Sequence, residues 1–569
     1  MNYNHHALRR ASYNTHGTQP SRMTMSSSVA PSLSSIPSRI LYFIFYILFF
    51  LFPSSAAYAQ DESAALTCLR RAIAITDATM QTSFTGSDLR MYDTYDTSTR
   101  HGSGTADVWP YTAALEAHCS VLEALEAVKD DAPELYAEHH DRFVTRLRQL
   151  YDNLAYYAGS YQLNSYARVA RWTIYGVHRG GSKGTATVTG IENVYDDQMW
   201  ICRELVRAYR LTGDKDYLKE AEKLANYCID GWDCCLDPDG NEYGGISWGP
   251  GYNSKHSCSN GPLIQPLVWL ADIYRADDEA EDLRYYYIEP DGTRTSTMRR
   301  HSELYLEMAR KIYAWQKEKL LNRSTGLYWD MCGAVKGEIQ YVRSGRFNYR
   351  DHVDLNGPSG TAYTYNTGTM LAGAAELFRV TGEADYQADL NDLCRNSYQR
   401  FSTRTRVAGH IFRQWPTDDQ ATSGFNTWFD NVLMRAYVDA LPYNDANTQA
   451  ADALASFREN LDYAWDNFRR DDLLPIHLLK GWDNGDVTKG FHQLAFAAEY
   501  AMLAVWCAGQ QQDIDAIGAV TETPPARYSA TADSRAYDVL GRPSAPPFRQ
   551  GLYVIDGRKV MISNTPASN

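Results

Sequence analysis

Residues 205–217, LVRAYRLTGDKDY, decide the fold, and residues 375–386, AELFRVTGEADY, repeat their pattern. In both stretches, apolar residues at helical spacing lead to a Thr-Gly pair, then to an acidic residue, and then to Asp-Tyr. The glycine favours a left-handed helix end, and the acidic residue favours the start of the next helix. The sequence therefore predicts the same helical hairpin at two places, which indicates an internal repeat.

Apolar residues at helical spacing continue outward from these hairpins, from about residue 64 to residue 509, as at Leu115, Leu122 and Leu125. A domain at residues 60–515 has room for six hairpins of about 75 residues each. That number suits a closed toroid of paired helices and is too large for a simple bundle. Gly/Pro/Asn-rich stretches at 237–251 and 354–360 interrupt the helices, and functional residues are expected in such loops.

The amino-terminal segment reads as a signal peptide with a long leader, at residues 1–59. An apolar run at 40–52 follows several arginines and precedes Ala57-Tyr58-Ala59, a small-residue cleavage signal. The run is shorter than the roughly 20 residues that span a membrane, so no stable span is expected after cleavage; an uncleaved anchor is the alternative. Met23 and Met25 are alternative starts. We expect an exported protein, in the periplasm, at the cell surface or outside the cell.

The charge balance argues against a polyanionic partner. Lys and Arg total 55 and Asp and Glu total 69, a net charge of −14, so nucleic acid is not expected to bind. The 41 tyrosines and 13 tryptophans suit stacking on sugar rings, although they equally suit a large helical core. A neutral partner and a monomeric chain are expected.

Ten cysteines in an exported chain permit disulfides. Four lie near one another in sequence, at Cys228, Cys234, Cys235 and Cys258, without the C-x-x-C pairs of a zinc site. Two interpretations stay open for this group, one disulfide or buried thiols.

The carboxyl-terminal residues 516–569 differ in composition from the rest of the chain. A proline-rich linker leads to residues 551–562, which read as a β-hairpin with Asp556-Gly557 as its turn. This segment, with residues 537–542, resembles the sorting tails of proteins exported by the type IX route. An ordinary β appendage is the alternative.

The strongest candidate for catalysis is residues 192–200, ENVYDDQMW, where a loop enters a helix. Acidic residues such as Asp196 and Asp197 are favoured at the start of a helix, so a purely structural role would also explain the pair. The flanking Tyr195 and Trp200 favour a sugar cleft instead. A retaining glycosidase needs two carboxyl groups about 5 Å apart, one ionised and one protonated, and repulsion between neighbouring acids raises the pKa of one of them.

Other loop residues are candidates for sugar binding. Gly244 and Gly245 allow a close backbone approach, and Trp248 offers a stacking face or a core side chain. Tyr365 and Asn366, at a helix expected to start near Thr369, either bind hydroxyls or cap the helix. Four further residues receive structural interpretations: Lys255 as a solvated cation, His256 as a bonded histidine, and Asp418-Asp419 as a surface turn.

These pieces together resemble glycoside hydrolase family 76, the α-1,6-mannanases, over residues 65–510. The resemblance rests on the order of short motifs: Trp109 ahead of a first long helix, Tyr195-Asp196-Asp197 with Trp200, residues 211–214, Gly244-Gly245-Ile246 with Trp248, Lys255 with Ser259-Asn260, and residues 363–368. Departures from the family pattern stand at Ser247, His256 and Thr367.

The resemblance implies an all-α (α/α)6 barrel that carries the small β appendage, and no metal or organic cofactor. It implies retaining endo-hydrolysis of an α-mannan or mannooligosaccharide, with Asp196 as nucleophile and Asp197 as general acid/base. Sugar contacts are expected from Tyr195, Trp200, Trp109, Gly244, Gly245, Trp248, Lys255, Asn260, Tyr365 and Asn366. Alternatives are a transglycosylase, a hydrolase of another α-linked glycan, a non-catalytic glycan-binding protein and a helical-repeat scaffold.

Overall fold

The structure, a computed structural model, describes residues 62–522 except 278–280, 336, 417–426, 446–447 and 484, and four short strands beyond residue 535. The predicted signal peptide and Asp418-Asp419 lie outside the described residues. Among the residues described, no helix has the length and apolar character to cross a membrane.

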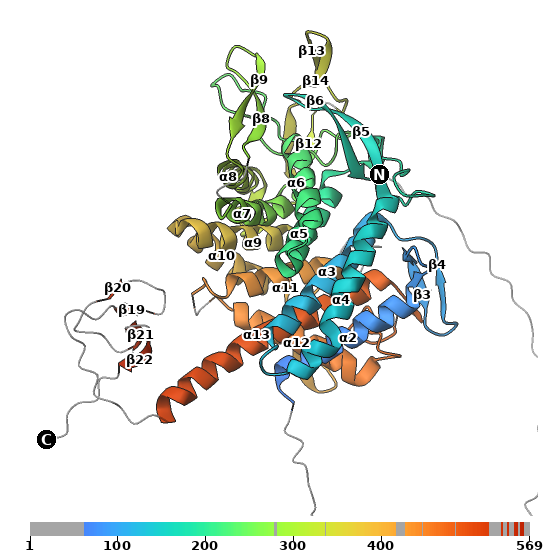
Figure 1. Cartoon of the computed structure of the whole chain (residues 1–569), viewed down its shortest axis with the longest axis vertical. Coiled ribbons are helices and arrows are strands. Elements are labelled where there is room, and N and C mark those ends of the chain that lie inside the picture. Colours follow the sequence, from blue (N-terminus) through green and yellow to red (C-terminus); the bar gives the residue numbers. More distant parts are fainter. Residues whose placement is uncertain are drawn as a thin grey trace, which may run out of the picture. The chain divides into compact units, whose positions relative to one another are not determined.

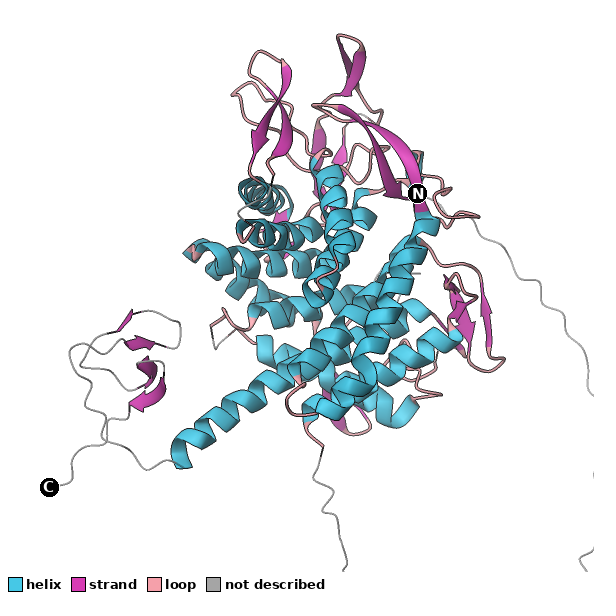
Figure 2. Cartoon of the chain, in the orientation of Figure 1, coloured by secondary structure: helices cyan, strands magenta, loops and turns pink. Residues whose placement is uncertain are grey.

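Helices dominate the described chain (Figures 1 and 2). Six form an inner ring: α3 (Val108–Ala127), α5 (Tyr195–Thr212), α7 (Gly261–Arg275), α9 (Thr364–Thr381), α11 (Thr427–Ala440) and α13 (Gly490–Glu522). Each packs on the next, and α13 closes the ring on α3. Six more lie outside it: α2 (Ala64–Thr82), α4 (Pro133–Leu154), α6 (Lys215–Ile229), α8 (His301–Leu320), α10 (Ala384–Phe401) and α12 (Ala450–Phe468). The predicted (α/α)6 barrel is confirmed.

Burial separates the two rings of helices. In α7, residues 261–271 are all buried, and in α9 the same holds for residues 364–375. The outer helices α4 and α6 instead bury one stripe of residues and expose the opposite face to water. This difference is what a barrel requires, because an inner helix has neighbours on all sides and an outer helix has a partner on one side only.

In both predicted hairpins, the first helix ends in the same way, at a glycine. Gly213 ends α5 at φ 72° and Gly382 ends α9 at φ 67°, both left-handed. Their N–H groups donate to Tyr209 O at 2.7 Å and to Phe378 O at 2.8 Å. The Asp214 carboxylate then accepts from the first turn of α6. The Thr-Gly signal is therefore confirmed as a helix end.

Two predicted helix positions need correction. Helix α9 begins at Thr364 rather than near Thr369, so Tyr365 and Asn366 lie inside its first turn. Trp109 lies in the first turn of α3, and the long helix α2 precedes it. Helix α9 starts earlier than the apolar pattern suggests, because the polar and aromatic side chains of its first turn are buried by the surrounding helices.

Short antiparallel strands fill the connections, which the sequence analysis treated only as loops. The longest hairpins are β5 (Ala158–Asn164) with β6 (Val169–Tyr175) and β8 (Leu283–Ile288) with β9 (Arg294–Arg299). A three-stranded sheet has the order β15-β12-β7, from β15 (Leu355–Ser359), β12 (Met331–Ala334) and β7 (Lys255–His256). The other strands are β1 (Phe84–Thr85), β2 (Arg90–Met91), β3 (Thr94–Asp96), β4 (His101–Ser103), β10 (Leu321–Asn322), β11 (Leu327–Tyr328), β13 (Tyr341–Ser344), β14 (Phe347–Arg350), β16 (Thr403–Val407), β17 (His410–Gln414) and β18 (Val487–Thr488).

The predicted carboxyl-terminal hairpin is confirmed. Strand β21 (Gly551–Ile555) pairs with β22 (Arg558–Ile562), with Ile555 opposite Arg558, which leaves a two-residue connection. Its two residues lie outside the described ones. With β19 (Ala536–Asp538) and β20 (Pro543–Ser544) the hairpin forms a four-stranded sheet. The role as a sorting tail stays a prediction, as does the domain boundary at residue 515, which α13 passes.

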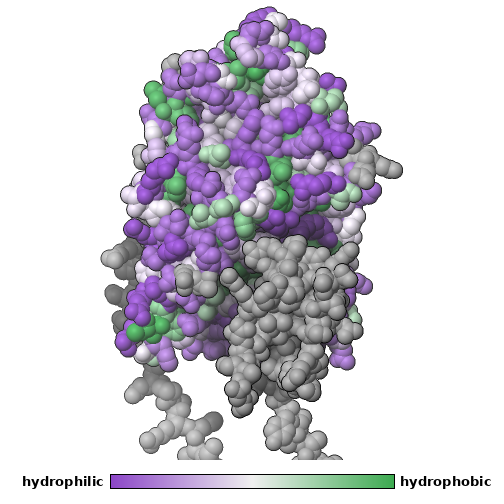
Figure 3. Space-filling view, turned by 90° about the vertical axis from the view of Figure 1, so that its left-hand side faces the viewer, coloured by the Kyte–Doolittle hydropathy of each residue, from purple (hydrophilic) through white to green (hydrophobic). Residues whose placement is uncertain are grey.

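All ten cysteines are buried free thiols. Of the two interpretations for the cysteines at 228–258, one disulfide or buried thiols, the structure therefore agrees with buried thiols. The face shown in Figure 3 is largely hydrophilic where residues are coloured, with hydrophobic side chains scattered among polar ones. That pattern is the ordinary one for a water-exposed surface.

Candidate active site

The amino-terminal ends of the inner helices meet through aromatic side chains. The Trp109 ring of α3 lies 5.3 Å from Trp428 of α11 and 4.8 Å from Phe491 of α13. Trp200 of α5 contacts Trp428 at 4.7 Å, and Tyr365 of α9 contacts Phe429 at 4.5 Å. Five inner helices thus start around one aromatic cluster. Trp428, Phe429 and Phe491 were missed from the sequence because no local motif marks them.

Asp196 and Asp197 lie in the first turn of α5, as predicted. Two contacts hold this turn: Tyr195 N–H donates to Trp248 O at 2.8 Å, and the Gln198 amide bonds both backbone groups of Tyr175 in β6. Asp196 is half-buried, and its Oδ2 accepts from Trp248 Nε1 at 3.4 Å. Its other oxygen, Oδ1, has no hydrogen-bond partner among the described residues.

The two carboxyl groups have raised pKa values. Burial raises the pKa of Asp196 to about 6, and the hydrogen bond from Trp248 opposes this shift. Burial, and then the negative charge of Asp196, raise the pKa of Asp197 well above its usual range. Asp197 therefore keeps its proton at a pH where Asp196 is ionised. The positive end of the α5 dipole favours the ionised member of the pair.

Trp248 and His256 border Asp196. Trp248 is half-buried, its ring stacks on His256 at 4.9 Å, and Tyr252 packs against it at 4.7 Å. His256 Nε2 bonds the Ser254 hydroxyl, and burial lowers the pKa of His256 to about 4, so the imidazole is neutral. The histidine at this departure from the family pattern thus supports Trp248. The other two departures, Ser247 and Thr367, are buried.

A third carboxyl group, Asp330, lies near the pair and was not expected. Tyr365 OH donates to Asp330 Oδ1 at 3.1 Å, and Cys258 interacts with both Tyr365 and Asp196. Burial raises the pKa of Asp330 to about 6. Asp330 follows β11 in a connection about 130 residues from Asp196 in the sequence, and its hydrogen bond with Tyr365 of α9 holds it here.

Several expected sugar contacts are buried side chains that hold the site together. Asn260 bonds the backbone of Ile246 on both sides and His256 O, and so pins the loop that carries Trp248. Asn366 donates to backbone carbonyls, Tyr195 packs on Tyr227 at 5.0 Å, and Trp200 is buried. Of the expected residues, Asp196, Trp248 and Trp109 are those left half-buried.

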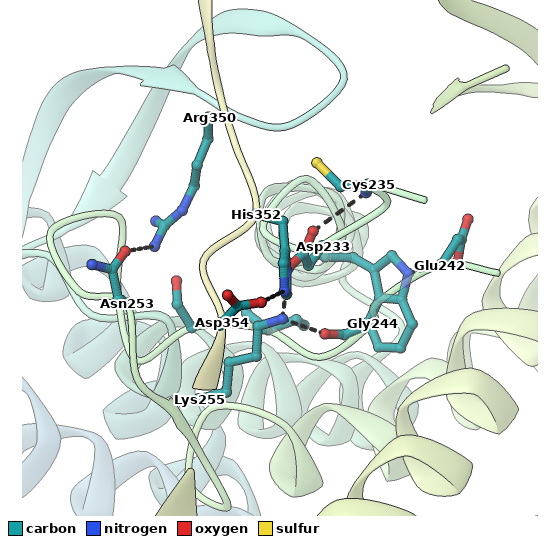
Figure 4. Close-up of polar contacts among 12 residues, drawn as sticks. Asp233, Cys235, Glu242, Gly244, Asn253, Lys255, Arg350, His352 and Asp354 are labelled. Atoms are coloured by element: carbon teal, nitrogen blue, oxygen red, sulfur yellow. Dashed lines mark hydrogen bonds and ion pairs between the residues drawn. The ribbon is translucent and has the colours of Figure 1, made fainter. Parts of the chain in front are cut away.

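Gly244, Gly245 and Lys255 belong to a second cluster (Figure 4). A Cβ on either glycine would lie within 3 Å of the Trp315 ring, so here the glycines make room for a tryptophan rather than for a sugar. Lys255 is 2% exposed, and its Nζ donates to Asp233 Oδ2 at 2.8 Å and to Gly244 O. The interpretation of Lys255 as a solvated cation is therefore wrong.

Asp233 receives a second donor. His352 Nδ1 lies 2.7 Å from the same Oδ2, and Tyr243 stacks on His352 with the ring centres 3.4 Å apart. Figure 4 shows Lys255 and His352 converging on Asp233. Burial opposes the charge of Asp233, but the Lys255 ammonium and the His352 hydrogen bond outweigh it and lower the pKa of Asp233 below its usual value.

Strand β7 separates the two clusters. Adjacent side chains on a strand point to opposite faces, and Lys255 pairs with Cys332 while His256 pairs with Met331. His256 lies on the side of Trp248, and Lys255 and Cys332 line a groove of about 960 Å³ together with Trp315 and Tyr243. Of the expected sugar-binding residues, Gly244 and Lys255 therefore line a space on the opposite face of β7 from His256.

Comparisons with known proteins agree with this architecture. The sequence profile of glycosyl hydrolase family 76 matches residues 151–282 and 294–469. No match was found among the curated protein sequences.

Solved structures share the fold at low sequence identity. A family 76 mannosidase from Bacteroides thetaiotaomicron VPI-5482 is 20% identical, with a TM-score of 0.55, over 79% of this chain and 100% of that one. An α-1,6-mannanase from Salegentibacter sp. HEL1_6, inactivated by changing two consecutive aspartates to asparagine and bound to α-1,6-mannotriose, is 19% identical, with a TM-score of 0.51, over 77% and 99%. An α-mannanase from B. thetaiotaomicron is 15% identical, with a TM-score of 0.51, over 79% and 97%.

Proposed function

Because the chain belongs to glycosyl hydrolase family 76 and is therefore a glycoside hydrolase, we propose that it cleaves α-1,6-linked mannan within the chain and with retention. The observation that carries the proposal is the pair Asp196-Asp197 at the start of an inner helix. Both have raised pKa values, and no cation among the described residues neutralises them. A glycosidase of this kind needs one ionised and one protonated carboxyl group.

In the first step, an Asp196 oxygen bonds the anomeric carbon while the glycosidic C–O bond breaks. Asp197 gives its proton to the leaving oxygen, so no free alkoxide forms. In the second step, the ionised Asp197 takes a proton from water as the water oxygen bonds the anomeric carbon, and Asp196 leaves as a carboxylate. Two inversions at the same carbon give net retention.

Neighbouring groups suit these roles. Trp248 fixes Oδ2 of Asp196, and Oδ1, which is buried, has no hydrogen-bond partner among the described residues, so no protein donor competes for its lone pairs. Trp248, which bonds Asp196, and Trp109 of the aromatic cluster supply half-buried rings, and aromatic rings stack on the apolar faces of sugars. The two mannanases among the similar structures support a mannan as the substrate.

The remaining features of the proposal concern the setting of the enzyme. We expect a monomer that is exported to the periplasm, the cell surface or the medium, and that binds an α-mannan or mannooligosaccharide rather than nucleic acid. The net charge of −14 supports a neutral polymer as the partner.

The test is to incubate the protein, without residues 1–59, with unbranched α-1,6-mannan and to follow product size and anomeric form by NMR. Early appearance of a range of α-anomeric oligosaccharides is expected. Initial β-anomers would contradict retention, release of mannose alone would contradict endo-cleavage, and products longer than an added mannooligosaccharide would show transglycosylation. Unchanged mannan and activity on another α-glycan would contradict the substrate.

A further inference from the structure

A pocket separate from the Asp196-Asp197 pair lies between the hairpins β5–β6 and β8–β9, near the end of α6. Both hairpins stand at the upper end of Figure 1. The pocket has a volume of about 220 Å³. Pockets for drug-sized ligands measure roughly 300–1,000 Å³, so this one suits a smaller molecule. None of the residues that surround Asp196 lines it.

Arg168 and Asp230 form the polar part of the pocket. Arg168 Nε donates to Asp230 Oδ2 at 2.6 Å, and the guanidinium lies between two rings, 4.9 Å from the centre of Trp172 and 4.5 Å from that of Tyr286. These contacts fix the plane of the guanidinium. Its two terminal nitrogens donate no hydrogen bond among the described residues, so their N–H groups remain available to a ligand.

The walls of the pocket are aromatic. Trp172, Trp232, Tyr285 and Tyr286 all contribute to the lining. The lining thus combines apolar rings with fixed donors and a carboxylate acceptor.

This combination selects for one chemical class. Adjacent hydroxyls of a sugar each donate and accept, which matches a guanidinium beside a carboxylate. An anionic ligand fits less well, because Asp230 already neutralises Arg168 and would repel a second carboxylate or phosphate. We propose that the pocket between β6 and β8 binds a single neutral pyranose ring, as a glycan chain end or branch, away from the catalytic carboxyl groups.

The proposal goes beyond the proposed cleavage reaction and does not depend on the linkage that the enzyme cuts. Its test uses titration calorimetry and saturation-transfer NMR on the protein without residues 1–59. The probes are the methyl pyranosides of mannose, glucose and galactose, and methyl glucuronide as the acidic counterpart. A Kd on the order of 1 mM is expected for at least one neutral glycoside, since a single ring makes few contacts.

Two variants assign the binding to this pocket. Arg168→Met removes the donors and keeps an apolar stem between the rings, and Tyr286→Ala removes one wall without touching the ion pair. Each is expected to weaken the Kd at least tenfold, while Arg171→Met, an exposed arginine on the same hairpin, leaves it unchanged. Tyr286→Ala also keeps full hydrolytic activity, which separates this pocket from the catalytic site.

Equal binding by wild type, Arg168→Met and Tyr286→Ala would overturn the proposal, as would no binding of any neutral glycoside. Binding of methyl glucuronide alone would overturn the neutral ring in favour of an acidic sugar. Tyr286→Ala keeps the test decisive if Arg168→Met leaves Asp230 uncompensated and unfolds the chain.

Discussion

Two buried acidic groups on either side of β7 have opposite electrostatics. Asp233 has the Lys255 ammonium and the His352 ring within 3 Å, and its pKa is lowered. Asp196 and Asp197 have each other and no cationic partner among the residues that the structure describes, and their pKa values are raised. A compensated carboxylate contributes to stability, whereas an uncompensated pair is costly to the fold and persists where it serves chemistry. The difference predicts which substitutions damage activity and which damage folding.

The largest effect is expected from Asp196→Ala. Loss of the proposed nucleophile removes the covalent step, so kcat on α-1,6-mannan should fall by about 10⁴-fold or more. The thermal unfolding midpoint should stay the same or rise, because an uncompensated carboxyl group is removed. Reducing-end release and calorimetry measure the two quantities. An active Asp196→Ala enzyme would end the assignment of this residue.

Asp197→Ala should lose about 10²- to 10⁴-fold on mannan, the range for a general acid. The loss should be much smaller on an aryl mannoside with a good leaving group, which departs without a proton. Steady-state kinetics on the two substrates give the comparison. Equal losses on both would contradict the role of proton donor.

Asp233→Asn should reduce the stability of the fold, because Asp233 is the carboxylate that has a cationic partner. It leaves the Lys255 ammonium buried without its partner, a change that costs about 3–5 kcal/mol in the free energy of unfolding. Denaturant unfolding measures it, and Asp354→Asn, an exposed acid in the same groove, is the matched control with little change. A stability as high as wild type would show that the ion pair is not what holds this loop.

The smallest effect is expected from Trp248→Phe, which keeps an aromatic ring and removes the N–H that bonds Asp196. Because this hydrogen bond lowers the pKa of Asp196, its loss raises the pKa further above 6. Asp196 must be ionised to attack, so the acid limb of kcat/KM against pH should move to higher pH. Trp482→Phe, whose indole bonds Phe468 O, is the control. A shift to lower pH would contradict the proposed contact.

Local signals predicted much of the fold. The Thr-Gly helix ends, the carboxyl-terminal hairpin and the position of Asp196 and Asp197 in a first turn all depend on residues a few positions apart. The start of α9 was predicted near Thr369 but lies at Thr364. The sequence pattern missed the first turn because its polar residues are buried by neighbouring helices, and a polar residue in the sequence does not indicate burial. The strands in the connections were missed for a similar reason, since short strands depend on partners that sequence spacing does not reveal.

The expected sugar contacts show the same limit. Residue types suggested hydrogen bonding for Asn260 and Asn366, and both do bond, but to backbone groups of neighbouring loops. Gly244 and Gly245 were expected beside a sugar, and Trp315 occupies that place. The donor and acceptor chemistry could be read from the sequence, while the partner could not.

The amino-acid sequence by itself determined the helical hairpins, their glycine ends, the pair of acids at a helix start and the order of motifs that marks the family. These follow from backbone preferences and charges within one or two turns of chain. The tertiary structure alone decided that α13 closes on α3, that the starts of five inner helices share one aromatic cluster, and that Asp330 accepts a hydrogen bond from Tyr365. It also decided that Asp233 forms an ion pair with the buried Lys255 side chain. Those outcomes depend on contacts between residues that lie in different helices and connections, in some cases more than 100 positions apart, which no local pattern encodes.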